Sequence, residues 1–252
     1  MWNILLVEPI LNLLMLFYEV LFSNLGLAIL GLTVVIRLVL FPLTLPSLRM
    51  SQKQAEIKPE LDKLKEKYKD DKEKLAQAQM KLMREHGVNP ALGCLPQIVQ
   101  LIVLIALYQV FRQVLAANGQ AVSALNQMLY FDFLKIPSDA SINTQFLYFD
   151  LTQPDPYYVL PILAGLSQAG LFLVGKKMRG GVKEENGTED KKSDSQEDSA
   201  DDIMQSMQSQ MGFIFPLMTV FIGLRLQSGL VLYWVASVAL SLVQQIVVAR
   251  QS

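Results

Sequence analysis

The 252-residue sequence contains one cysteine and one histidine, and its 22 lysines and arginines are balanced by 23 aspartates and glutamates. A single cysteine cannot form an internal disulfide, which excludes a disulfide-stapled secreted domain. The lack of a basic surplus argues against specific nucleic-acid binding. A GxxxxGK[ST] phosphate loop is also missing, so the chain has no evident site for nucleotide hydrolysis.

Charge is distributed very unevenly along the chain. Residues 49–92 hold 11 basic and 8 acidic residues, and residues 176–211 hold 6 basic and 9 acidic residues. The rest of the chain contains nearly uncharged apolar stretches of about 20 residues, the helix length that crosses roughly 30 Å of hydrocarbon. This pattern predicts an all-α polytopic membrane protein.

Five segments have the composition of transmembrane helices. They are residues 24–45, 93–115, 157–175, 212–226 and 229–249. Because the fourth segment is short, it predicts either local thinning of the bilayer or a helix that begins before the segment.

Residues 1–23 are apolar but contain no lysine or arginine, so they lack the basic region of a cleaved signal peptide. Glu8, Asn12, Glu19 and Ser23 fall on one stripe of a helix, with apolar residues around it. This pattern predicts an amphipathic helix that lies in the membrane interface. The alternative is a sixth transmembrane span.

Lysine and arginine predict the orientation in the membrane. The two charged segments and Arg250 place 18 basic residues on one side, whereas the other side has three. Since basic residues accumulate in cytoplasmic loops, we expect the N-terminus outside and the C-terminus in the cytoplasm. An odd number of spans agrees with this arrangement.

Residues 49–88 have a helical pattern on the predicted cytoplasmic side. Ile57, Leu61 and Leu64 recur at helical spacing, and a second such pattern follows a charged break. The segment therefore predicts a cytoplasmic helical hairpin. Pro59 suits the first turn of a helix, so we expect a discontinuity near residues 57–58.

Two further segments connect the predicted spans. Residues 116–156 mix aromatic and polar side chains, and we expect this extracytoplasmic segment to pack against the membrane surface. Residues 176–211 form a cytoplasmic loop that carries few apolar side chains between 176 and 202. Such a segment cannot offset its chain entropy by burial, so we predict that it is largely disordered.

Arg37 is the charged residue deep within the predicted spans. The spans contain no Asp, Glu, Lys or His, so we predict no catalytic residue, no metal site and no cofactor. A charge at mid-span costs about 2.5–3.5 kcal/mol, and we expect Arg37 to face a wet cavity. The alternative is snorkelling to the cytoplasmic surface, about 12 Å away. The polar residues that could line the cavity are Gln97, Gln100, Ser167, Gln168, Thr219, Ser237, Ser241 and Gln244.

Several ordered motifs resemble one family along the whole chain. These motifs are Val34–Thr44 around Arg37, Asn89-Pro90 followed by Gly93–Pro96 and Gln100, Gln153–Tyr158 with Leu160–Gly165, and Ser228–Trp234. Together they resemble the YidC membrane-protein insertases and their mitochondrial and thylakoid relatives. The resemblance implies a bacterial cell membrane protein with five transmembrane helices around a hydrophilic groove. It also implies that Arg37 and Gln100 lie in that groove.

The resemblance implies an insertase and chaperone that works without ATP hydrolysis. Nascent membrane-protein clients and the lipid bilayer are the expected partners, and the Sec translocon, the ribosome and the signal recognition particle machinery are further candidates. The hairpin residues that we expect to capture a client or a ribosome are Lys63, Lys65, Lys67, Met80 and Met83. Two alternatives remain at this stage. One is a secondary transporter or channel with an intramembrane anion site, and the other is a chaperone beside the Sec translocon.

Overall fold

The computed structural model describes residues 1–69, 71–89, 95–117, 122–137, 142–178 and 214–250. From residue 179 on, the loop that the sequence predicts to be disordered lies outside these ranges. The elements in chain order are η1 (Asn3–Val7), α1 (Glu8–Val20), α2 (Leu25–Glu56), α3 (Lys58–Lys67), α4 (Lys72–Glu85), α5 (Leu95–Ala117), α6 (Val122–Gln127), η3 (Asp132–Leu134), β1 (Gln145–Phe146), β2 (Phe149–Asp150), α7 (Val159–Met178) and α9 (Ser228–Arg250). An apolar helix, Ile214–Gly223, precedes α9.

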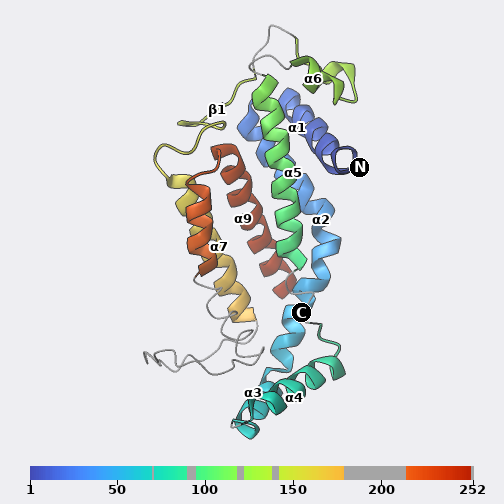
Figure 1. Cartoon of the computed structure of the whole chain (residues 1–252), viewed down its shortest axis with the longest axis vertical. Coiled ribbons are helices and arrows are strands. Elements are labelled where there is room, and N and C mark those ends of the chain that lie inside the picture. The colour runs from blue at the N-terminus through green and yellow to red at the C-terminus, as the bar shows by residue number, and fades with distance from the viewer. Residues whose placement is uncertain (70, 90–94, 118–121, 138–141, 179–213, 251–252) are drawn as a thin grey trace.

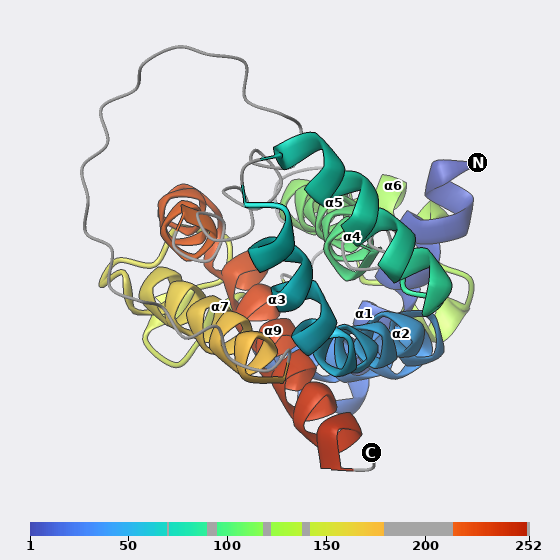
Figure 2. The same cartoon turned by 90° about the horizontal axis from the view of Figure 1, so that it is seen from below.

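Helices α2, α5, α7 and α9 run side by side along the long axis of the molecule (Figure 1). Helix α9 packs along both α7 and α2, and α1 packs on α2. Helices α3 and α4 pack against each other and lie across one end of this bundle (Figure 2). We call the opposite end the distal end (Figure 1). The described part of the chain from α6 to the start of α7, with η3, β1 and β2, is the distal segment.

The helices have the length and composition of a polytopic membrane protein. Four of the described helical segments could cross a bilayer, and the shorter apolar helices are Val159–Gly175 and Ile214–Gly223. The four longer segments are Asn3–Val20, Leu25–Glu56, Leu95–Val114 and Ser228–Ala249. The predicted all-helical class therefore holds for the described residues apart from the two-residue strands β1 and β2, which pair antiparallel.

The N-terminal helix is long enough to span a bilayer, but its contacts place it obliquely. The indole of Trp2 donates a 3.0 Å hydrogen bond to Gln109 of α5, and Gln109 lies only about 12 Å along α5 from the distal Ala117. The segment Asn3–Val20 is itself about 27 Å long. Its first residue therefore lies beside the distal half of α5.

Helix α2 continues past residue 45, where the sequence predicts the span to end. Pro42 and Pro46 lie inside the helix, and most residues after Pro46 are polar. Gln52 on this extension donates to the backbone carbonyl of Val248 in α9 at 3.2 Å. The predicted break near residue 57 coincides with the boundary between α2 and α3. Residues 49–56, assigned from the sequence to the hairpin, thus extend the transmembrane helix.

Asn12 connects α1 to the distal end. Its amide donates to the backbone carbonyl of Met128 at 2.8 Å, and its carbonyl accepts from the backbone N–H of Tyr130 at 2.7 Å. The side chain of Asn12 is only 6% exposed. The sequence placed Asn12 on the polar stripe of an interfacial helix, but the distal segment covers this part of the stripe and takes up its hydrogen bonds.

The distal segment is also fixed to the start of α9. Gln153 accepts hydrogen bonds at its backbone carbonyl from the N–H and the hydroxyl of Ser228, at 2.8 and 2.7 Å. The N–H of Gly229 donates to the carbonyl of Leu151 at 3.0 Å. These contacts hold the distal segment against the start of α9, and the side chain of Leu151 is fully buried.

A buried carboxylate fixes the start of α7. Asp155 is 3% exposed, and its oxygens accept from the backbone N–H groups of Tyr157 and Leu160 at 3.0 and 2.7 Å. The hydroxyl of Tyr148 donates a third hydrogen bond at 3.2 Å. Buried charges are tolerated when hydrogen bonds replace their hydration, so Asp155 serves as a rigid junction between the distal segment and α7.

Candidate functional site

Arg37 of α2 is held by polar side chains of two neighbouring helices. Its Nε donates to the hydroxyl of Ser237 in α9 at 2.8 Å, and its Nη2 donates to Oε1 of Gln100 in α5 at 2.9 Å. The Ser237 hydroxyl also donates to Gln100 Oε1 at 3.1 Å. Gln244, two turns further along α9, donates to the backbone carbonyl of Arg37 at 3.4 Å. We call these four residues the Arg37 cluster.

The Arg37 cluster has donor groups without protein acceptors. Among the described residues Arg37 forms no ion pair with a carboxylate, and its bonds to Gln100 and Ser237 leave N–H groups over. The amide nitrogen of Gln100 is buried and has no hydrogen-bond partner in the described part of the chain. Such groups are costly in a low-dielectric interior, so the cluster has a capacity to bind water or an acceptor supplied by another molecule.

A buried tyrosine borders the cluster. Tyr233 lies one helical turn before Ser237 on α9 and is 1% exposed. Tyr233 belongs to the family motif Ser228–Trp234 but is not among the cavity residues predicted from the sequence. Its place beside the guanidinium could not be recognised without knowing the rotation of α9.

The other predicted cavity residues do not join the cluster by a hydrogen bond. Thr219 is buried but donates to the carbonyl of Phe215 in its own helix at 2.8 Å. Ser241 similarly donates to the carbonyl of Ser237, at 3.1 Å. Gln97 is exposed, and Ser167 and Gln168 of α7 are half-buried.

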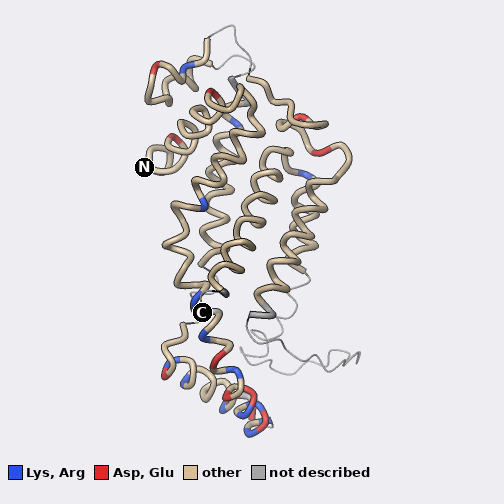
Figure 3. The backbone as a smooth tube through the Cα atoms, turned by 180° about the vertical axis from the view of Figure 1, so that it is seen from behind, with Lys and Arg blue, Asp and Glu red and all other residues tan. Residues whose placement is uncertain are grey.

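Charged residues concentrate on α3 and α4, while the four helices of the bundle carry few (Figure 3). Three lysines of α3 that we expect to capture a client or a ribosome are exposed, namely Lys63, Lys65 and Lys67. On α4, Met80 is exposed and Met83 is half-buried. Lys67 lies over the ring of Tyr68, with its Nζ 5.3 Å from the ring centre.

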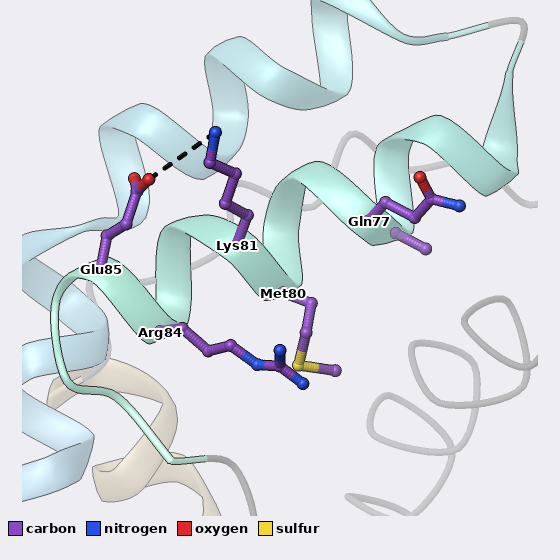
Figure 4. A pocket seen from close by; sticks show the side chains of 6 residues that line it. Gln77, Met80, Lys81, Arg84 and Glu85 are labelled. Carbon is purple, nitrogen blue, oxygen red and sulfur yellow. Dashed lines mark ion pairs between the residues drawn. The ribbon is translucent and has the colours of Figure 1, made fainter.

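Helix α4 carries an open pocket of about 470 Å³. Met80 and Arg84 project to the same side of the helix, and Lys81 pairs with Glu85 at 3.9 Å on the other side (Figure 4). Gln77 and Ala76 complete the lining. The pocket combines an apolar thioether with a guanidinium, which suits a peptide that has both apolar and acidic side chains.

The start of α4 is fixed by Asp71, whose carboxylate accepts from the backbone N–H of Lys74 at 3.0 Å and pairs with its ammonium at 2.7 Å. The hydrogen bond from the Lys74 side chain, helped by the one from its backbone, lowers the pKa of the Asp71 carboxyl. A lowered pKa means that the cap stabilises the helix at neutral pH and that this contribution is lost as the pH falls through that pKa.

The fold and the cluster define a multi-pass helical membrane protein in which polar side chains of neighbouring helices hold an intramembrane arginine. Residues 16–252 match the family described as the 60Kd inner membrane protein. The chain belongs to this family, and the resemblance to the YidC insertases is thereby confirmed.

Individual relatives are similar over most of this chain. A membrane protein insertase YidC from Fusobacterium nucleatum is 34% identical over 229 residues, 91% of this chain and 88% of that protein. The membrane protein insertase MisCA of Bacillus subtilis is 31% identical over 93% of this chain and 74% of its own length. A YidC insertase from Mannheimia succiniciproducens is 31% identical over 90% of this chain. The aligned part is only 34% of that longer relative.

Proposed function

We propose that the protein inserts other proteins into the bacterial membrane, without ATP hydrolysis, through a hydrophilic groove that contains the Arg37 cluster. In this mechanism the polar tail or loop of a client enters the groove while its apolar segment moves into lipid. The observation that carries the proposal is the buried amide nitrogen of Gln100, which has no hydrogen-bond partner among the described residues and lies beside the remaining N–H groups of Arg37. The names of the relatives support the same function.

The groove lowers the barrier because it replaces part of the transfer of polar groups through hydrocarbon. Each unsatisfied backbone group costs several kcal/mol in lipid. The positive charge of Arg37 attracts acidic tails, and an inside-negative potential pushes them outward by about 2.3 kcal/mol per charge per 100 mV. No chemical energy source is needed once the apolar segment of the client is stable in lipid.

The packing of α5 supports an opening on its side of the bundle. Helix α5 contacts η1, α1 and α6, and it packs less extensively on α2 and α9 than α7 packs on α9. Towards the hairpin end Ile98 and Leu101 of α5 are 51% and 55% exposed. Near this end Gln100 bonds α5 to Arg37 of α2 and Ser237 of α9, and we propose that α5 separates from them here and that clients leave the groove past its exposed face.

Reconstitution of the purified protein alone tests the function. In vesicles with a small single-span client and without nucleotide, we expect the tail of the client to become protected from added protease. A secondary transporter or channel that uses Arg37 as an anion site would instead give solute flux without protection. A chaperone of the Sec translocon would give neither result until the translocon is added.

Further partners follow from this role. We propose that nascent membrane proteins contact the Arg37 cluster and that the hairpin of α3 and α4 provides the first contact with a client or a ribosome. The Sec translocon and the signal recognition particle machinery are proposed partners that deliver such clients. The chemistry that supports the hairpin role is the exposed lysines of α3 together with the Met80 and Arg84 pocket of α4.

We propose that the hairpin end lies in the cytoplasm and the distal end outside. In a variant with Cys94 replaced by serine, a cysteine at Gln145 of β1 should react with an impermeant thiol reagent on intact protoplasts. A cysteine at Gln77 of α4 should react only after the membrane is opened. Both side chains are exposed, so accessibility within the protein does not bias the comparison. The opposite labelling pattern would reverse the orientation.

Replacing residues 58–85 with a Gly/Ser linker should reduce insertion severalfold and leave the bundle folded. Helix α3 has no buried residue, so its loss removes little packing. The measurement is client protection in vesicles, with the thermal unfolding midpoint as the test of folding. Unimpaired insertion would show that the hairpin is dispensable, and a large fall in the midpoint would assign it to stability. A Lys63→Gln, Lys65→Gln, Lys67→Gln variant separates the role of charge from that of the apolar pocket.

A further inference from the structure

Large apolar side chains stand exposed at three turns of the distal end. Phe22 between α1 and α2 is 89% exposed, Leu147 between β1 and β2 is 82% exposed, and Tyr158 before α7 is 54% exposed. Their φ angles are 58°, 53° and 59°. This left-handed conformation costs an L-residue about 1–2 kcal/mol and normally falls to glycine or asparagine. A turn that faced only water would favour those residues, so three exposed apolar side chains at such turns indicate a partner.

A fourth exposed site consists of two stacked rings. Phe131 and Phe133 are 56% and 65% exposed, and their ring centres are 5.5 Å apart. Asn12 of α1 holds the backbone just before this pair, and Asn126 of α6 holds the backbone just after it. The rings are therefore presented by a rigid scaffold, although folding inward would bury their apolar surface.

The electrostatic character of this site indicates an uncharged partner. Asp132, between the two rings, pairs with Lys135, and the hydrogen bond from that lysine lowers the pKa of the Asp132 carboxyl. The Asp132–Lys135 pair itself carries no net charge. On α1, Leu16 and Val20 are 36% and 66% exposed and extend the apolar surface along the molecule. A charged protein surface is a poor match, whereas a zwitterionic lipid surface is a good one.

We propose that Phe22, Phe131, Phe133, Leu147 and Tyr158, the apolar anchors, insert into the boundary between headgroups and acyl chains in the leaflet at the distal end. Transmembrane helices end at this level, and aromatic side chains are enriched there. The anchors come from four separate turns, so together they fix the depth and tilt of the bundle. This inference requires neither the insertase function nor the proposed orientation.

The experiment uses the full chain with Cys94 replaced by serine, reconstituted into pure phosphatidylcholine vesicles. Single cysteines at Phe133, Leu147 or Gln145 carry an environment-sensitive fluorophore, and Gln145 of β1 is the matched exposed control. Quenching by a nitroxide at a shallow position of the lipid acyl chain is compared with quenching by iodide on both sides of the membrane.

We expect the labels at Phe133 and Leu147 to be quenched at least about twofold more by the lipid nitroxide than the label at Gln145, and less by iodide. Because all three sites carry the same fluorophore, its own affinity for lipid cancels. If the labels at Phe133 and Leu147 match the label at Gln145, the lipid assignment is overturned. The vesicles contain no other protein, so that outcome would leave the anchors free for a protein partner.

Discussion

Arg37→Ala should lower the insertion of clients with acidic tails about tenfold, a change of about 1.4 kcal/mol in the barrier. The guanidinium is the only charge that the cluster offers, and an ion pair at 4 Å is worth about 4 kcal/mol at an effective dielectric constant of 20, before desolvation is subtracted. Clients with neutral tails should lose much less. The measurement is protease protection of matched acidic and neutral clients at equal protein level.

The folded state should tolerate this substitution. Removal of a charge from mid-span relieves about 2.5–3.5 kcal/mol, and Ser237 remains hydrogen-bonded to Gln100 without the arginine. Arg37→Lys is the matched control, since it keeps the charge but loses the planar set of donors. Full activity of the lysine variant would assign the effect to charge. If Arg37→Ala inserts both clients like the parent, the charged-groove mechanism is wrong.

Gly229→Ala should destabilise the protein by about 1–3 kcal/mol, the usual cost of overpacking a core. A Cβ at this position would lie 2.3 Å from Cε1 of Phe111 and 3.1 Å from the carbonyl oxygen of Leu151. Phe111 is 1% exposed and has little room to move, and the Leu151 carbonyl accepts the hydrogen bond of Gly229. The change therefore loosens the connection between the distal segment and α9.

The thermal unfolding midpoint in detergent micelles measures this effect. Gly170→Ala is the control, because a Cβ there meets nothing within 4 Å and alanine stabilises a helix interior by about 0.5–1 kcal/mol over glycine. Adding Phe111→Leu to Gly229→Ala should recover part of the loss, as expected for residues in direct contact. Equal midpoints for Gly229→Ala and the parent would exclude the steric account.

Intramembrane polarity identified polar side chains of the spans, but only some of them bond to Arg37. Arg37, Gln100, Ser237 and Gln244 meet in space, as expected for polar groups that avoid lipid. Thr219 has the same polarity in the sequence yet is satisfied by the carbonyl one turn earlier. A hydroxyl can bond within its own helix or across an interface, and sequence alone does not distinguish the two.

The ends of the helices were harder to predict than their interiors. Hydropathy finds where a helix leaves hydrocarbon, but α2 continues as a helix into its polar extension, where Gln52 bonds to α9. Likewise, Asn12 looked solvent-facing because its partners in the distal segment are 116 and 118 residues away. Close approaches such as Phe146 on Gly26 depend on tertiary packing and have no local signal.

The passage of polar client segments past the Arg37 cluster is the central claim, and site-specific photocrosslinking tests it most directly. A photoreactive residue is placed at Gln244, whose side chain bonds to the backbone of Arg37, or at its neighbour Val243, which is 56% exposed on α9. With a client arrested during insertion, we predict that Gln244 crosslinks to the polar tail and that Val243 does not. Crosslinks to the tail from Val243 but not from Gln244 would contradict the account.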